Sequence, residues 1–211
     1  MRYIAVEGVI GVGKTALAER LADRLSGHLV LEEIEENPFL GRFYQDIAGY
    51  AFQTQLFFLL SRCKQQQELR QPELFDETIV SDYLFEKDRV FASLNLTEHE
   101  FALYEKVYEL LARDVVRPDL LVYLQARTDV LLGRIRQRGR PFEAPLGREY
   151  LDSLADAYNR FFLHYDASPM LIVNTERVDF VASQEDMNDL FKAIQTTTKG
   201  RRFYSPRGKG H

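Results

Sequence analysis

The feature that most constrains this chain is its residues 8–15, which read GVIGVGKT. They match the pattern G-x-x-x-x-G-K-T, in which backbone N–H groups curl around phosphate oxygens and glycine keeps side chains out of the way. The apolar run at 3–6 predicts a strand before this loop, and the apolar spacing at 16–22 predicts a helix after it. A helix N-terminus attracts anions, so the stretch predicts a site for nucleotide phosphates. The residues expected around the phosphates are Gly8, Gly11, Val12, Gly13, Lys14 and Thr15.

Composition favours a single globular domain. The chain has 211 residues, 45% hydrophobic and 28% charged, which is ordinary for one domain. Its net charge of −5 argues against a surface that binds nucleic acid. Residues 199–211 carry five basic side chains and no acidic one, so the remainder holds 22 basic against 32 acidic residues. We expect one domain over residues 1–198, followed by a basic, disordered tail over residues 199–211.

The chain's single cysteine and its short apolar runs bear on its location. One cysteine, Cys63, cannot form an intramolecular disulfide and suits a reducing compartment. The longest apolar run, residues 56–60, is far too short to span a membrane. The first residues lead directly into a strand, with no visible signal peptide. We therefore expect a cytoplasmic protein without a membrane partner.

Alternation of short apolar runs with longer helical patterns predicts the fold class. Strand-like runs lie at 3–6, 29–31, 79–81, 120–124 and 170–173, without the turn signals of hairpins between them. Such spacing requires crossover connections, so we expect an α/β fold with a parallel five-stranded sheet flanked by helices. Ligands bind at the carboxyl ends of such strands, which directs attention to the residues that follow each run.

An acidic segment and a long helical segment follow the second predicted strand. Residues 32–36 place four carboxylates in five positions, either as a solvated loop or with one catalytic carboxylate facing the phosphate loop. Residues 39–67 read mostly as helix, with Gly49 as a weak point. In an unbroken helix, Tyr44, Gln55 and Arg62 would lie within about 20° of one another. This alignment predicts a polar binding face, or alternatively a stripe that faces solvent.

Charged residues also follow the third and fourth predicted strands. Asp82 comes directly after the third, where a carboxylate can reach a metal beside Thr15 or simply favour a helix N-terminus. After the fourth, four arginines lie at alternate positions from 134 to 140, next to glycine and proline. Guanidinium groups bind phosphate with two parallel hydrogen bonds, which predicts a mobile arginine-rich lid over an anion. A nucleic-acid patch is the alternative, but no interleaved aromatic residues accompany these arginines.

Together these motifs resemble the deoxynucleoside kinase family, and its bacterial purine-specific branch in particular. The resemblance runs from Gly8 to about Tyr150 and rests on the spacing of its parts. The family has a glutamate before an acidic E-N-P stretch, then a tyrosine, a glutamine and an arginine on one helical region. A strand-end acid with an aspartate six residues later comes next, and then an arginine-rich lid that ends in glutamate. The matching residues are Glu32, Glu36, Asn37, Pro38, Tyr44, Gln55, Arg62, Asp82, Asp88, Arg134, Arg138, Arg140 and Glu143.

The resemblance implies a phosphate-loop kinase fold, ATP as phosphate donor, Mg²⁺ as cofactor and a homodimer. Glu32 would be the general base on the substrate 5′-hydroxyl, with Glu33 as the alternative one position away. The residues that would stabilise the moving phosphoryl group are Lys14, Arg138, Arg140 and Mg²⁺ on Thr15 and Asp82. Arg134 would join the phosphate loop in binding ATP. The residues that would bind the nucleoside are Glu32, Tyr44, Gln55, Arg62, Asp82, Asp88 and Glu143, and their donors and acceptors favour a purine base.

One departure from the family pattern lies directly after the strand-end acid. The family has arginine and serine there, whereas this chain has Tyr83 and Leu84. The family's arginine helps to hold the acceptor 5′-oxygen and the phosphates. Lys87 and the lid arginines are the candidates to replace it, and the sequence does not choose between them.

Two other functions compete with a deoxynucleoside kinase. A nucleoside monophosphate kinase of the thymidylate kinase type shares the fold and the lid, but it needs a cation for the acceptor phosphate, and Tyr83 removes the obvious candidate. A non-catalytic phosphate-loop nucleotide-binding module is the second alternative. A GTPase switch would carry Asp-x-x-Gly after a strand and Asn-Lys-x-Asp for guanine, and the sequence has neither.

Overall fold

The computed structural model describes residues 2–70, 78–176 and 178–204 of this chain. Among these residues, no helix is long and apolar enough to cross a membrane. The strands are β1 (Tyr3–Gly8), β2 (His28–Val30), β3 (Ile79–Ser81), β4 (Leu120–Gln125), β5 (Met170–Asn174) and β6 (Arg201–Tyr204). The α-helices are α1 (Lys14–Leu25), α2 (Leu40–Phe43), α3 (Ile47–Leu69), α4 (Lys87–Asn95), α5 (Glu98–Leu111), α6 (Thr128–Arg138), α7 (Arg148–His164) and α8 (Gln184–Thr196). Two short 3₁₀ turns, η2 (Ala112–Asp114) and η3 (Pro141–Glu143), complete the described elements.

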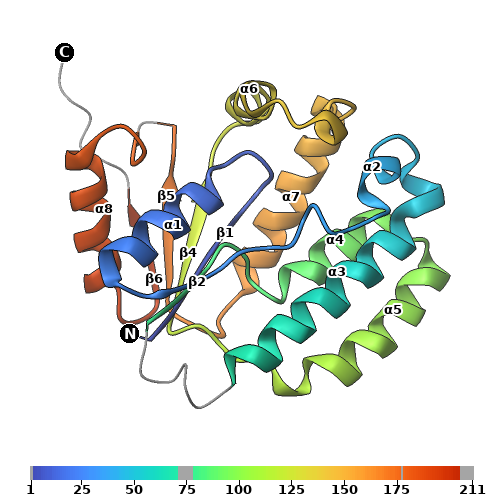
Figure 1. The fold of residues 1–211 in the computed structure, drawn as a ribbon, viewed down its shortest axis with the longest axis horizontal. Coiled ribbons are helices and arrows are strands. Elements are labelled where there is room, and N and C mark those ends of the chain that lie inside the picture. The colour runs from blue at the N-terminus through green and yellow to red at the C-terminus, as the bar shows by residue number, and fades with distance from the viewer. Residues whose placement is uncertain (1, 71–77, 177, 205–211) are drawn as a thin grey trace.

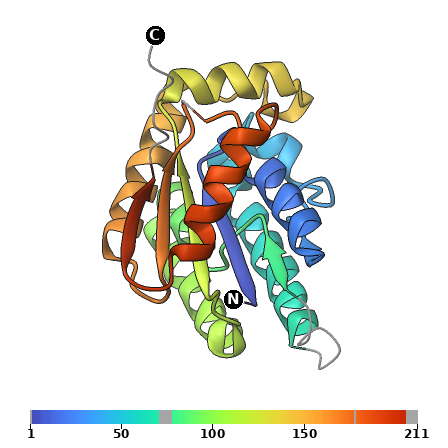
Figure 2. The same ribbon diagram turned by 90° about the vertical axis from the view of Figure 1, so that its left-hand side faces the viewer.

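The six strands form one parallel sheet in the order β2-β3-β1-β4-β5-β6. Helices α1 and α8 lie on one side of this sheet, and α4 and α7 lie on the other, with α3 and α5 packed outside them (Figures 1 and 2). This is the expected α/β architecture, because parallel strands need crossover connections that place helices over both faces.

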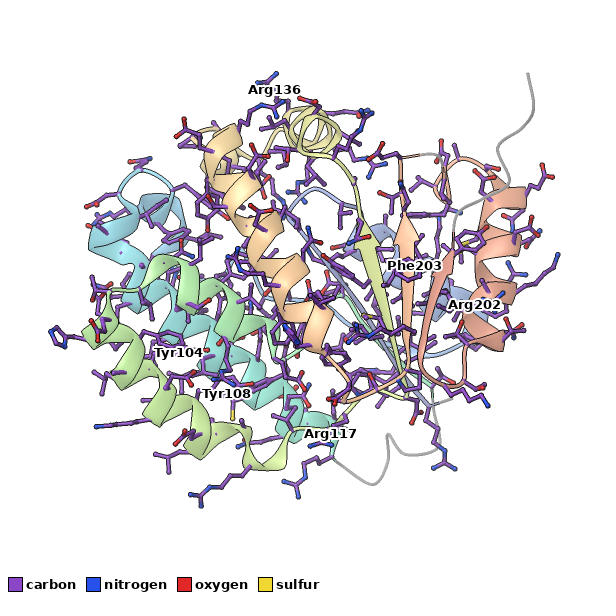
Figure 3. The ribbon with its side chains drawn as sticks, turned by 180° about the vertical axis from the view of Figure 1, so that it is seen from behind. Tyr104, Tyr108, Arg117, Arg136, Arg202 and Phe203 are labelled. Carbon is purple, nitrogen blue, oxygen red and sulfur yellow. The ribbon has the colours of Figure 1, made fainter. Side chains whose placement is uncertain are left out.

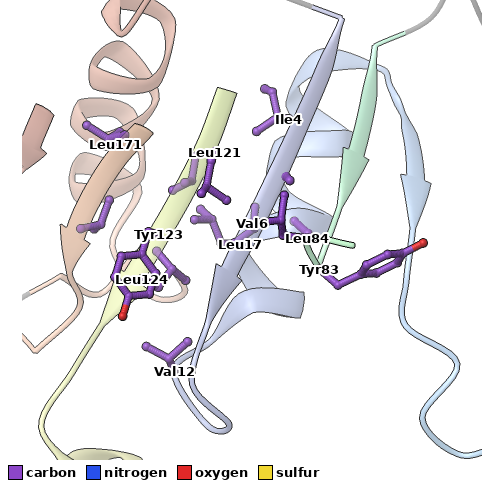
Figure 4. Close-up of a cluster of buried hydrophobic side chains, with 14 of the residues drawn as sticks. Ile4, Val6, Val12, Leu17, Tyr83, Leu84, Leu121, Tyr123, Leu124 and Leu171 are labelled. Carbon is purple, nitrogen blue, oxygen red and sulfur yellow. The ribbon is translucent and has the colours of Figure 1, made fainter. Parts of the chain in front are cut away.

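The core is centred on the middle strands. Every residue of β1 is buried, and so are the first five residues of β4. Ile4, Val6 and Leu121 lie among the side chains that fill the space between the sheet and its helices (Figure 4). Each such aliphatic side chain contributes about 1.5–3 kcal/mol of hydrophobic stabilisation when it is fully buried. The strand that leads into the phosphate loop is therefore buried along its whole length.

The strand register brings three chain segments to one edge of the sheet. Ala5 of β1 and Val30 of β2 both pair with Ser81 of β3, so the residues that follow these strands leave the sheet side by side. Those residues are the phosphate loop, the acidic segment from Glu32, and Asp82. Helix α6 lies across the same end of the sheet (Figure 1). The candidate site is assembled here.

The sixth strand corrects the expectation of a five-stranded sheet with a disordered tail from residue 199. Arg201–Tyr204 pair in parallel with β5. As an edge strand this segment buries little, and Phe203 is 76% exposed, so its sequence lacks the apolar pattern that marks a strand. Figure 3 shows Arg202 and Phe203 on this strand, at the edge of the sheet. The rest of the predicted tail, 205–211, lies outside the described residues.

The predicted helix over 39–67 is interrupted before Gly49, not at it. The chain forms the short α2, leaves helical structure around Tyr44, and begins again as α3. Asp46 caps α3, and its side chain accepts a hydrogen bond from the Gly49 N–H at 3.0 Å. Tyr44 therefore does not share a helix with Gln55 and Arg62, and the expected alignment on one helix face was wrong for Tyr44.

The cap at Asp46 predicts a measurable loss of stability. Asp46→Ala removes the acceptor of one helix N-terminal N–H and should lower the free energy of unfolding by about 1 kcal/mol. Urea denaturation would measure this change. Gln45→Ala is the matched control, because Gln45 is also exposed and caps nothing. Equal stability of the two variants would contradict a capping role.

Candidate active site

The phosphate loop connects β1 to α1 in a conformation that requires glycine. Gly8, Gly11 and Gly13 all have positive φ angles, of 154°, 84° and 106°. A Cβ on Gly8 would also collide with the carbonyl oxygen of Leu124 in β4. Helix α1 begins directly after Gly13, with no side-chain cap and no acidic residue in its first turn. Its N-terminal N–H groups and dipole are thus directed at an anion site that no side chain fills.

Lys14 lies within this loop. Its Nζ donates to the carbonyl oxygen of Gly8 at 2.7 Å, and the carbonyl oxygen of Val9 lies 3.5 Å from the same nitrogen. Burial lowers the pKa of Lys14, an effect that Glu7 opposes and the positive charge of Lys87 reinforces. An ammonium group this close to the free N–H groups of α1 is placed to meet phosphate oxygens.

Asp82 joins the phosphate loop to the acidic segment. Its Oδ2 accepts a hydrogen bond from the Thr15 hydroxyl at 2.6 Å, and its Oδ1 accepts one from the Glu32 N–H at 2.8 Å. A hydroxyl and a carboxylate beside a phosphate site fit Mg²⁺, which prefers oxygen ligands and takes few of them from protein. Among the described residues, no cluster of three His, Cys, Asp or Glu side chains could hold a metal ion.

Glu32 is the centre of a buried chain of charges. Its Oε1 accepts hydrogen bonds from Arg62 of α3, and its Oε2 accepts one from Lys87 Nζ at 2.9 Å. Burial alone would raise the pKa of the Glu32 carboxyl, but Lys87 and Arg62 outweigh burial and hold it well below its ordinary value. Glu32 is therefore an anion at neutral pH. Its neighbour Glu33 instead accepts a hydrogen bond from Ser61 at 2.5 Å.

Asp88 binds Arg62 on the side away from the cavity. It accepts a hydrogen bond from Arg62 Nη1 on one oxygen and from the Tyr104 hydroxyl at 2.9 Å on the other. Burial, reinforced by the charge of Asp88, raises the pKa of Tyr104 and keeps its proton in place. Both Asp88 oxygens are thus occupied by protein donors, and this carboxylate orients the Arg62 guanidinium.

A single cavity of about 960 Å³ connects these groups. It extends from the phosphate loop, past Glu32, to Gln55 on α3, and in the other direction to the segment 178–182 after β5. This volume is at the upper end of the range for small-molecule sites. Predicted site residues that line it are Gly11, Val12, Gly13, Lys14, Thr15, Glu32, Tyr44, Gln55, Arg62, Asp82, Arg134, Arg138, Arg140 and Glu143. Gly8 and Asp88 lie outside this lining.

The predicted arginine-rich lid is the end of α6 with η3. Arg138 binds both oxygens of Glu143 at 2.7 and 2.8 Å, and Arg140 lies 3.9 Å from the same carboxylate. Phe142 precedes Glu143 in η3, and its ring stacks on the ring of Tyr44, with centroids 6.5 Å apart and planes 6° from parallel. The lid therefore touches the segment between α2 and α3 as well as the cavity.

Arg134 lies at the root of this lid. Its guanidinium donates to the carbonyl oxygen of Val12 at 3.0 Å and to the hydroxyl and carbonyl of Thr175 at 2.9 and 2.8 Å. Burial lowers the pKa of Arg134, with Asp179 and Glu176 opposing. This arginine faces the cavity, and it also fixes the phosphate loop to the end of β5.

Comparison with known proteins identifies the family. A family model described as deoxynucleoside kinase matches residues 4–199. This chain belongs to the deoxynucleoside kinase family. The match includes the phosphate loop, the acidic segment, the polar helix α3 and the lid, so the resemblance inferred from residue spacing is confirmed.

Several relatives are similar over most of their length. This deoxynucleoside kinase is 36% identical to the deoxyguanosine kinase of Bacillus subtilis (strain 168), over 87% of this chain and 91% of that protein. It is 30% identical to the deoxyadenosine kinase of Lactobacillus acidophilus, over 92% and 95%. A structure of deoxyadenosine kinase from M. mycoides, with products dCMP and a flexible dCDP bound, superposes with a TM-score of 0.80 at 25% identity, covering 92% of this chain and 98% of that one.

Two residues of this deoxynucleoside kinase site escaped prediction from the sequence. Glu7 is wholly buried and accepts hydrogen bonds from the N–H groups of Gly8 and Leu84. A carboxylate at the end of an otherwise apolar strand was the signal that could have drawn attention to it. Tyr104 gave no such signal, because aromatic residues at helical spacing are usual in a packed helix such as α5.

The Tyr104–Asp88 contact predicts a difference between two neighbouring tyrosines of α5, both labelled in Figure 3. Tyr104→Phe removes a hydrogen bond to a buried carboxylate and should lower the free energy of unfolding by about 1.5–3 kcal/mol. Tyr108→Phe is the control, because the Tyr108 hydroxyl makes no hydrogen bond to the described residues. Chemical denaturation of both variants would measure the effect, and a loss of equal size in each would show that Tyr104 does not support Asp88.

Proposed function

We propose that this deoxynucleoside kinase transfers the γ-phosphoryl group of ATP to the 5′-hydroxyl of a deoxynucleoside and prefers purines. The observation that carries this proposal is the continuous cavity from the phosphate loop to Gln55. Phosphoryl transfer needs a donor and an acceptor held in line, with charge stabilisation between them. A cavity that passes from the phosphate loop to the Glu32 carboxylate and then to the polar pocket at Gln55 meets this need.

The donor would occupy the end of the cavity formed by the phosphate loop and the segment 178–182. The N–H groups at the start of α1 and the Lys14 ammonium would bind its phosphates. Thr15 and Asp82 would hold Mg²⁺, which would neutralise part of the negative charge of the phosphates. Arg138 and Arg140 would reach the transferring group from the lid.

Glu32 would receive the acceptor's 5′-hydroxyl. Its carboxylate lines the cavity beside Asp82 and is held anionic by Arg62 and Lys87. A carboxyl with so low a pKa is a weak base, so its main effect is to orient the hydroxyl and to take its proton late, as the bond to phosphorus forms. In the loose transition state of phosphoryl transfer, little bond to the attacking oxygen has formed, so a strong base is not required.

Tyr44 and Glu143 would bind the deoxyribose 3′-hydroxyl. Both line the cavity, one from the segment after α2 and the other from the lid. Because Phe142 stacks on Tyr44 and Arg138 holds Glu143, the sugar would contact two groups that belong to the lid or touch it. Sugar binding and lid closure would then be coupled.

Gln55 would select the base. Its side chain is buried against the cavity, and its amide makes no hydrogen bond to the described residues. Arg62, in contrast, is already bonded to Glu32 and Asp88. A free amide offers an NH₂ donor group and a carbonyl acceptor, which match N7 and the N6 amino group of adenine. Relatives named as deoxyguanosine and deoxyadenosine kinases support a purine substrate.

A panel of deoxynucleosides and ribonucleosides at fixed ATP and Mg²⁺ tests this proposal. We expect purine deoxynucleosides to exceed thymidine in kcat/KM by a wide margin, of the order of a hundredfold, because a polar pocket rejects bases that leave its groups unpaired. Gln55→Leu should remove most of that preference. Gln53→Leu, an exposed glutamine on the same helix, should keep it. If thymidine were the best substrate of the unmodified enzyme, the proposed base pocket would be wrong.

The neighbouring glutamates provide a matched test of the catalytic carboxylate. Glu32→Gln keeps the shape of the side chain but cannot take a proton, and kcat should fall about a hundredfold or more. Glu33→Gln should stay close to wild type, because Glu33 contacts Ser61 instead of the cavity. Steady-state kinetics with the best nucleoside would measure both. Loss of activity in Glu33→Gln alone would move the role by one residue.

The homodimer and the cytoplasmic location stay predictions from the sequence and from the family resemblance. Sedimentation of the purified protein would measure the oligomeric state, and fractionation of cells would measure the location.

A further inference from the structure

Lys87 is a buried cation at the wall of the cavity. It is the first residue of α4 and is only 2% exposed, although lysine side chains usually extend until the ammonium reaches water. Its Nζ lies 2.9 Å from Glu32 Oε2, on the side of that carboxylate opposite Arg62. Lys87 and Lys14 line the same cavity from different elements.

Glu7 keeps the Lys87 ammonium in this position. The Glu7 carboxylate lies 3.9 Å from Lys87 Nζ, at the end of the buried strand β1. It is itself fixed by the N–H groups of Gly8 and Leu84, both at 2.8 Å, and by the Tyr158 hydroxyl at 3.2 Å. A carboxylate bound by three donors cannot follow a moving lysine, so Lys87 lies between two anions of fixed position.

An ammonium group has three donors, and Lys87 uses one of them in a hydrogen bond to the described residues, the one to Glu32. The others remain for a ligand in the cavity. The carboxylate that Lys87 touches is the one expected to hold the acceptor's 5′-hydroxyl. An oxygen placed on Glu32 would thus lie within reach of Lys87, and the phosphoryl group arriving from the Lys14 side would meet the same cation.

We propose that Lys87 is a catalytic residue that donates to the acceptor's 5′-oxygen and to the phosphoryl group in transit. This inference rests on the proposed kinase reaction. As the 5′-oxygen attacks phosphorus, its proton passes to Glu32, the bond from phosphorus to the β–γ bridging oxygen breaks, and ADP leaves. Lys87 forms and breaks no covalent bond in this step. It offers a fixed positive charge where negative charge collects on the phosphoryl oxygens.

The other residues that could have supplied this charge are uncharged or already paired. Tyr83, which follows the strand-end acid, carries no charge and is wholly buried, with its ring directed away from the strands β1 and β4 (Figure 4). That ring instead lies 5.9 Å from Lys87 Nζ and packs beside it. In the lid, Arg138 is bound to both oxygens of Glu143. Lys87 and Arg62 are therefore the cations that stand at Glu32 before any ligand arrives, and Arg62 is also bound to Asp88, which leaves Lys87 with donors for the ligand.

Lys87 could instead act only by holding Glu32 in place, and a double-mutant cycle separates the two roles. In the wild-type background, Lys87→Met should lower kcat about a hundredfold or more, with the nucleoside KM changed by less than about threefold, because the lost interaction belongs to the transition state. In the Glu32→Gln background, Lys87→Met should still lower kcat by about tenfold or more. A residue that only positions Glu32 would cause no further loss there.

Matched variants control for folding and charge. Arg89→Met removes a cation from the same helix and the same kind of ion pair, but Arg89 is exposed and pairs with Glu105 away from the cavity, so kcat should not change. Lys87→Arg retains the charge and should recover at least about tenfold of the activity that Lys87→Met loses. Lys87→Gln, which keeps donors but no charge, serves if Lys87→Met does not fold, and should be equally impaired.

The outcomes distinguish this inference from the proposed function. If the wild-type protein phosphorylates no nucleoside, the proposed function fails and Lys87 has no reaction to assist. If the wild-type protein is active and folded Lys87→Met or Lys87→Gln retains kcat within about twofold, the inference is overturned while the function stands. It is also overturned if Lys87→Met causes no further loss in the Glu32→Gln background.

Discussion

The site depends on one carboxylate, Asp82, which binds two chain segments that the sheet only brings near. One oxygen accepts from the Thr15 hydroxyl at the start of α1, and the other accepts from the backbone of Glu32. Parallel strand pairing sets the distance between these segments, but it does not fix the direction in which each leaves the sheet. Asp82 is only 3% exposed, and hydrogen bonds to a carboxylate are stronger than those between neutral groups. The proposed metal ligands and the carboxylate proposed as catalytic are thereby held in one unit.

From this unit a line of alternating charges runs into the protein: Asp88, Arg62, Glu32, Lys87 and Glu7. Each member is buried or nearly so, and an unpaired charge in such a place would be costly. Alternation removes that cost, because every anion touches a cation and each outer anion is also bonded to neutral donors. Such an arrangement need not stabilise the fold more than apolar residues would. It does fix the direction of the groups that face the cavity, so little reorganisation is left for the moment of reaction.

The sequence was sufficient wherever local chemistry decides the outcome. A G-x-x-x-x-G-K-T loop between a strand and a helix allows few conformations, and most of the site residues predicted from the phosphate-loop motif and the family spacing do line the cavity. It failed where several residues could play the same local role or where distant contacts decide. The break around Tyr44 precedes the cap formed by Asp46, which is one of several polar residues that could have begun the next helix. Strand β6 forms because β5 offers an open edge, and its own exposed side chains carry no pattern. Asp88 matched the family by position, yet its surroundings turn it toward Tyr104.

Arg134 divides α6 into two parts of different character. From within the helix, its hydrogen bonds to Val12 and Thr175 join α6 to the phosphate loop and to the residue after β5. At its tip, Gly139 ends the helix in a left-handed conformation, and the lid arginines lie on either side of this residue. A movement that leaves the bonds of Arg134 intact would carry the lid arginines away from the cavity without disturbing Val12. The phosphate loop would then keep its shape through every such movement, and nucleosides could exchange while the loop's own contacts to a triphosphate persist.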